Sequence, residues 1–157
     1  MKKFLPRNRS ELGFTLIELL VVIGILAILL TIVLIAINPA RQFGQANDTR
    51  RRSDVTQILN AIGAYAADNA GTLPAGITAT TSAIANTGAD LCADLVQNYI
   101  PALPSDPQAA NGGIAIEAAD CVSPYNTEYE VSRDAGNRVT VSAPLTEQAT
   151  PDISNTR

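Results

Sequence analysis

Histidine and tryptophan are both absent from this chain of 157 residues, and aromatic residues make up only 4% of it. Without histidine the commonest general acid/base and the commonest metal ligand are missing, which excludes a Ser-His-Asp triad and a Cys-His pair. Two cysteines are too few to form a cysteine-rich zinc site on their own. We therefore predict that the protein is not an enzyme and that it holds neither a cofactor nor a metal.

Basic residues are also scarce, since 15 acidic residues outnumber 11 basic ones and leave a net charge of −4. This balance argues against nucleic acid as a main partner. Four of the basic residues lie within the first nine positions: Lys2, Lys3, Arg7 and Arg9. The positive charge is thus concentrated at the N-terminal end, and the length of the chain suits one soluble domain and not two.

A long apolar run follows the basic end. From Phe14 to Ile37, 20 of 24 positions are apolar, and the exceptions are two threonines, one glycine and Glu18. A helix of this length spans roughly 36 Å, against about 30 Å for the hydrocarbon core of a bilayer. We predict a transmembrane helix over residues 14–37, with its basic end in the cytoplasm and the remainder of the chain outside.

Three interpretations compete for this segment. A secretory signal would have a shorter apolar run, followed by a small-residue cleavage site that the sequence lacks. A plain membrane anchor gives no reason for Glu18, because an acid in the middle of a membrane helix costs roughly 2.5–3.5 kcal/mol. In the third interpretation the chain is cut between Gly13 and Phe14, and the new amine of Phe14 pairs with Glu18 of a neighbouring parallel helix. Such pairing would penalise wrong axial registers and so specify assembly.

The segment from Gly13 to Glu18 (GFTLIE), after a short basic leader, resembles the prepilin signature of type IV pilins and type II secretion pseudopilins. The resemblance implies that a prepilin peptidase removes residues 1–13 and methylates the amine of Phe14. It implies a precursor held in the lipid of the inner membrane, and an assembly ATPase and a membrane platform protein as partners. It also implies a homo-oligomeric helical filament, at the cell surface or in the periplasm.

The residues after the apolar run predict a second helix and a globular head. Pro39 breaks the helix, because proline has no amide hydrogen and restricts the residue before it. Apolar positions then recur at spacings of three and four between Val55 and Tyr65, which indicates an amphipathic helix from about Ala40 to Asp68 or Asn69. Residues 38–70 thus form the amphipathic half of a long N-terminal helix, and residues 71–157 form the head.

The head is predicted to contain a small antiparallel sheet. Residues 78–88 (TATTSAIANTG) have the composition of a surface loop, and a short helix is expected over residues 90–99. Strands are expected over residues 113–118, 127–132 and 138–143, with the last two joined into a hairpin by a turn at 134–137. The predicted fold is α+β, a long helix packed against about three strands.

Two further features of the head each allow two interpretations. Cys92 and Cys121 form either a disulfide, which would contribute about 3–4 kcal/mol outside the cell, or two unpaired buried thiols. The run of arginines at 50–52 is either a patch for DNA or an anionic surface, or a solvated helix face with i,i+4 pairs to Asp48 and Asp54. We predict the disulfide and the solvated face.

The function that these patterns favour is a structural subunit of a type IV pilus-like filament. The alternatives are a minor pilin or a pseudopilin, and a membrane-anchored extracellular binding domain that does not polymerise. Adhesion, motility, DNA uptake and secretion share this subunit architecture, so the sequence does not choose among them.

Overall fold

The computed structural model of the chain describes residues 13–122 and 124–157. The predicted leader therefore lies outside the described residues, except for Gly13. The chain divides into two compact units, of which one ends at Pro39 and the other runs from Ala40 to Arg157.

The first unit contains helix α1, Leu16–Ile37, in which all residues are exposed. Apolar side chains occupy every side of the helix, as expected for a segment that lies in lipid or packs among other apolar helices. The helix ends at Asn38, whose backbone is left-handed with φ 48° and ψ 79°. Pro39 begins the next helix, where its missing amide hydrogen costs nothing.

The second unit is built around helix α2, Pro39–Asp68. The apolar face expected from the sequence is confirmed, because Val55, Ile58, Leu59 and Ile62 are all buried. These side chains pack in one hydrophobic core with residues of the sheet, among them Tyr129, Val131, Val141 and Ile153. The amphipathic pattern of α2 is therefore what positions the head on the helix.

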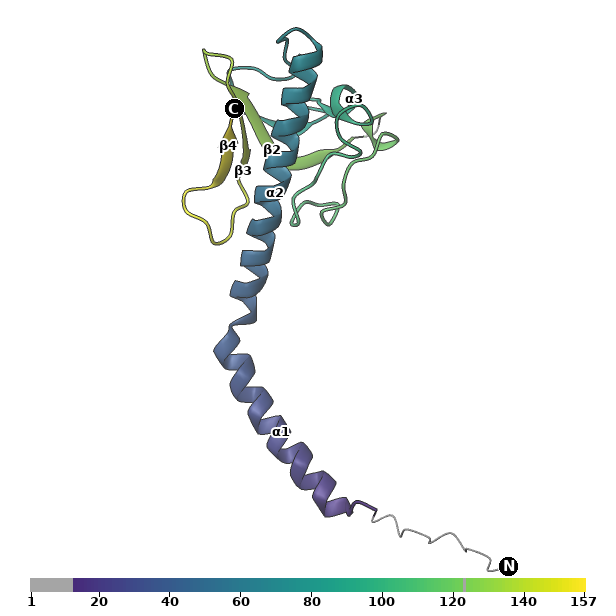
Figure 1. The fold of residues 1–157 in the computed structure, drawn as a ribbon, viewed down its shortest axis with the longest axis vertical. Coiled ribbons are helices and arrows are strands. Elements are labelled where there is room, and N and C mark those ends of the chain that lie inside the picture. The colour runs from purple at the N-terminus through teal and green to yellow at the C-terminus, as the bar shows by residue number, and fades with distance from the viewer. Residues whose placement is uncertain (1–12, 123) are drawn as a thin grey trace, which may run out of the picture. The chain divides into compact units, whose positions relative to one another are not determined.

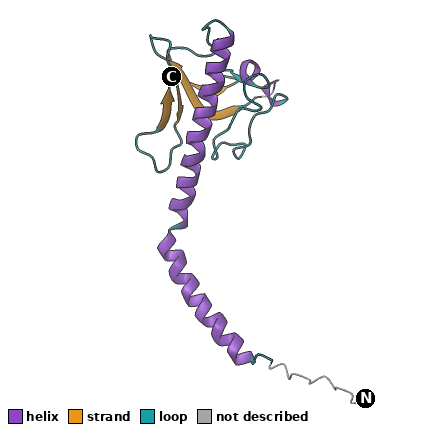
Figure 2. Ribbon diagram, in the orientation of Figure 1, coloured by secondary structure: helices purple, strands orange, loops and turns teal. Residues whose placement is uncertain are grey.

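The sheet has four antiparallel strands in the order β1-β2-β3-β4. Their bounds are β1 Ser82–Ala85, β2 Asn126–Arg133, β3 Val139–Ala143 and β4 Ile153–Thr156. Within this unit α2 crosses in front of the sheet, with β4 on one side of it and the short helix α3, Cys92–Leu95, on the other (Figure 1). Figure 2 shows that the rest of the unit around these strands is largely loop.

The α+β fold and the β2–β3 hairpin are confirmed, but the strand count is wrong. Residues 113–118 form no strand, because Ile116 makes only an isolated bridge with Leu103. Strand β1 lies within residues 78–88, which were predicted as loop, and β4 was not predicted. Both are four residues long and rich in small or polar side chains, so their pairing with longer strands decides their conformation.

The predicted helix at 90–99 is also shorter than expected. It covers only Cys92–Leu95, because Val96 is extended and Gln97 has a positive φ of 75°. A disulfide joins Cys92 to Cys121, with their Cα atoms 5.4 Å apart and 29 positions apart in the sequence. It ties α3 to the short 3-10 turn Asp120–Val122 in a head that has few large side chains.

Candidate functional site at the start of the apolar helix

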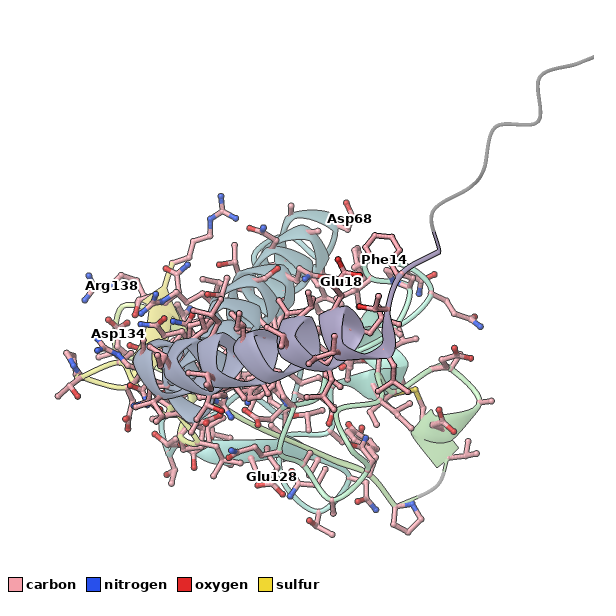
Figure 3. The ribbon with its side chains drawn as sticks, turned by 90° about the horizontal axis from the view of Figure 1, so that it is seen from below. Phe14, Glu18, Asp68, Glu128, Asp134 and Arg138 are labelled. Atoms are coloured by element: carbon pink, nitrogen blue, oxygen red, sulfur yellow. A yellow bond between two sulfur atoms is a disulfide. The ribbon has the colours of Figure 1, made fainter. Side chains whose placement is uncertain are left out.

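The predicted cleavage position lies just outside α1. Gly13, Phe14 and Thr15 are not helical, and Thr15 has an extended backbone with φ −78° and ψ 151°. The side chain of Phe14 is exposed, and Phe14 and Glu18 both lie at the N-terminal end of α1 (Figure 3). The peptide bond between Gly13 and Phe14 is therefore separated from the helix by two residues.

Thr15 and Glu18 close this end of the helix through a reciprocal capping box. The Thr15 hydroxyl accepts from the Glu18 N–H at 3.2 Å, and Glu18 Oε2 accepts from both the N–H and the hydroxyl of Thr15 at 2.9 Å. Both bonds to the carboxylate use Oε2, so Oε1 has room for a further donor. The spacing Thr-x-x-Glu before an apolar run signals this box in the sequence.

The surface of α1 is apolar over its whole length. Its mean hydropathy is 3.4 over an 18-residue window, and it is the one helix in the described part of the chain that is long and apolar enough to cross a bilayer. Large side chains such as Leu16 and Ile35 are about 80% exposed. A surface of this size needs lipid or other helices to cover it.

A second group of charged residues lies inside the head, where the sequence predicted only a solvated face. Arg51 is fully buried and donates from Nε and Nη2 to the two carboxylate oxygens of Asp106, at 2.7 and 2.9 Å. Its Nη1 donates to Asp48 at 2.9 Å and to Glu147 at 3.2 Å. The prediction of a solvated arginine run is therefore wrong for Arg51.

The predicted ion pairs of the run are half right. Arg50 lies 3.6 Å from Asp54, as expected, but Asp48 pairs with Arg51 and not with Arg52. Asp48 and Arg51 are both buried where the C-terminal loop binds this side of α2, whereas Arg52 is exposed, so the i,i+3 pair forms in place of the i,i+4 pair. Sequence reasoning missed this cluster because two of its acids, Asp106 and Glu147, are 55 and 96 positions from Arg51.

Asp48 also fastens the C-terminal loop to α2. Its carboxylate accepts the backbone N–H groups of Glu147, Gln148 and Ala149 at 2.7–2.9 Å. Burial opposes the charge of Asp48, but these three donors and Arg51 outweigh it and lower its pKa to about 2. The carboxylate is therefore ionised and saturated with donors at neutral pH.

Asp54 has the opposite electrostatic balance. Burial raises its pKa above the usual range, while the hydroxyl of Tyr129, which donates to Asp54 at 2.8 Å, and the charge of Arg50 act against the shift. Burial and this bond to Asp54 raise the pKa of Tyr129 as well.

In the described residues, no three His, Cys, Asp or Glu side chains converge as a metal site.

An apolar helix of bilayer length, with an acid in its first turn five positions after a glycine, suits a membrane-anchored precursor. Residues 8–34 match the model of the prokaryotic N-terminal methylation motif, and the chain thus carries the prepilin-type signature of type IV pilins and pseudopilins. Proteins with this signature are structural subunits and are in general not enzymes. Neither a curated protein nor a solved structure matches the chain.

Proposed function

We propose that the protein is a structural subunit of a type IV pilus-like filament. The observation that carries this proposal is the exposed apolar helix α1 with one carboxylate in its first turn, inside the matched signature. The precursor would lie in the inner membrane through α1, with residues 40–157 outside. Removal of the leader by a prepilin peptidase would then free the amine of Phe14, which the peptidase methylates.

The same helix would form the core of the filament. Because apolar side chains cover all sides of α1, each copy can pack against several others once it leaves the lipid. Glu18 would be costly in such a core without a cation, and the freed amine of Phe14 in a neighbouring copy would supply one. An assembly ATPase and a membrane platform protein would supply the work of extraction.

Mass spectrometry of the protein from its own cells tests the processing step. The expected product begins with N-methylated Phe14, and an intact N-terminus at Met1 in surface material would contradict the proposal. Electron microscopy of sheared surface material tests assembly, with Glu18→Ala expected to lose most filaments. The matched control is Glu11→Ala, which removes an acid from the leader and leaves the mature product unchanged.

A membrane-anchored binding domain that never polymerises would give a different result. In that case the wild-type chain would stay in the membrane fraction, no filaments would be sheared from the cells, and Glu18→Ala would change neither result. A major and a minor subunit would differ in their abundance within purified filaments.

A further inference from the structure

The three consecutive arginines of α2 have three different environments. Arg51 is buried among carboxylates, and Arg50 donates to the carbonyl of Gly113 at 2.6 Å and faces Asp54. Arg52 is exposed, and within the described residues it forms no ion pair. The head thus uses two of the three charges internally and presents the third on its surface.

Arg52 lies between two polar hollows on the α2 side of the head. One hollow is formed with the loop at Gln148 and Ala149, and the other with Pro151, Asp152 and strand β4. Asp48 lines the first hollow, but both of its oxygens are occupied by Arg51 and by backbone N–H groups. Asp152 lines the second hollow together with Arg52 but forms no salt bridge with it. Among the described residues the guanidinium of Arg52 therefore has no carboxylate within salt-bridge distance.

A hollow of opposite charge lies at the start of β2. It has a volume of about 350 Å³, Asp120 and Glu128 contribute its carboxylates, and no basic residue is among the described residues that line it. Glu128 has a positive φ of 62° in a bulged part of the β1–β2 ladder, and it lies on the side of the head away from α2 (Figure 3). A guanidinium on a long side chain fits this volume and charge.

From this complementarity we infer that Arg52 of one copy docks into the Asp120–Glu128 hollow of a second copy. The two surfaces lie on different sides of the same head, so each copy can give a cation to one neighbour and receive one from another. A contact of this kind is heterologous, and it continues from copy to copy without closing into a dimer. The inference rests on the proposed filament function and adds a contact between heads to it.

Charge reversal tests the docking in cells that assemble the wild-type chain. Arg52→Glu and Glu128→Arg should each lower the yield of sheared filaments about fivefold, since exposed ion pairs are modest but are repeated at every added copy. The chain that carries both substitutions restores the opposite charges and should recover most of the yield. Added salt should weaken wild-type filaments in the same direction.

Matched controls separate docking from folding and from net charge. Arg133→Glu lowers the net charge by two as Arg52→Glu does, at an exposed arginine that forms no ion pair within the described residues, and Glu130→Arg raises it by two as Glu128→Arg does. Both controls should keep the wild-type yield. Unchanged yield in Arg52→Glu, or no recovery in the double variant when the purified chains melt like wild type, would overturn the docking.

Cysteine cross-linking gives a second measurement that does not depend on filament yield. A chain with both Arg52→Cys and Glu128→Cys should form a ladder of linked copies under mild oxidation, while each single variant and the pair Arg138→Cys and Glu128→Cys should not. Wild-type filaments without this ladder would overturn the docking and leave the filament function standing. An absence of both filaments and ladder would count against both.

Discussion

The guanidinium of Arg51 binds the carboxylate of Asp106 in a two-pronged geometry, at 2.7 and 2.9 Å, with both side chains fully buried. This bond joins α2 to a loop 55 positions later in the chain. A buried arginine with this geometry fixes the position of both segments, because either charge left alone would be poorly solvated.

Removal of Arg51 is therefore expected to destabilise the head strongly. Arg51→Ala leaves the buried carboxylates without their cation and should cost about 3–5 kcal/mol of unfolding free energy. Arg51→Lys keeps the charge but loses the paired geometry, so its unfolding free energy should lie between those of wild type and Arg51→Ala.

Urea unfolding of the detergent-solubilised chain measures this cost. All four tyrosines lie in residues 40–157, so tyrosine fluorescence reports on the head and not on α1. The matched control is Arg52→Ala at the adjacent exposed position, expected within about 0.5 kcal/mol of wild type. Similar losses for the two alanine variants would show that burial of Arg51 contributes nothing.

Acid should weaken the attachment of the C-terminal loop at Asp48. Its pKa of about 2 lies below the value near 3.9 of an unfolded aspartate, so the unfolded chain binds more protons between these values. The contribution of Asp48, about 2 kcal/mol, is fully present above pH 4 and is lost as the pH falls through 2.

The comparison of unfolding free energies at pH 5 and pH 2.5 measures this loss. Asp48→Asn should be less stable at pH 5 and should lose less on acidification than wild type. Asp134→Asn is the control, because Asp134 also has a lowered pKa through bonds with Arg138 and Gly136 but lies on the surface. A wild-type acid dependence that survives in Asp48→Asn would rule out this carboxylate as its source.

Two neighbouring glycines allow the cost of backbone strain to be measured apart from the cost of a steric clash. Gly112 and Gly113 both have positive φ, of 70° and 75°, so alanine is strained at either position. A Cβ at Gly112 would meet open space, whereas at Gly113 it would lie 2.9 Å from the Cα of Pro107. Gly112→Ala should cost about 1 kcal/mol, and Gly113→Ala about 1–3 kcal/mol more.

The same urea unfolding experiment compares the two variants. Gly113 also accepts the bond from Arg50, so a shift of its backbone would disturb the loop that carries Asp106. Equal costs at the two positions would mean that the loop moves freely enough to accept the added methyl group.

The sequence predictions that the structure confirms depend on residues that are close together in the chain. The apolar face of α2 repeats at spacings of three and four, and the β2–β3 hairpin forms across a short turn, so local spacing was sufficient for both. Arg51 could not be distinguished from its exposed neighbour Arg52 in the same way. Its partners at Asp106 and Glu147 are 55 and 96 positions away, and only the folded loops bring them to α2.

The short strands failed for a related reason. Ile84 and Ala85 are the only buried residues of β1, and Ile153 is the only one of β4, so neither strand has an alternating pattern long enough to recognise. Each forms because a longer strand offers it hydrogen bonds. The third expected strand has apolar residues at Ile114 and Ile116, but Ile114 is 70% exposed and makes no ladder.

The capping box at the start of α1 should control local order there. Thr15→Val keeps the shape of the side chain but removes the hydroxyl that accepts from Glu18 and donates to it, at a cost of about 1 kcal/mol. The amide hydrogen of Glu18 should then exchange with solvent about fivefold faster, and Thr15→Ser should restore the wild-type rate. Thr31→Val is the matched control, because the Thr31 hydroxyl bonds the Ala27 carbonyl within the same helix and far from the cap. Hydrogen exchange on the full chain in lipid nanodiscs measures the rates, and equal effects of the two valine variants would show that the cap does not hold Glu18.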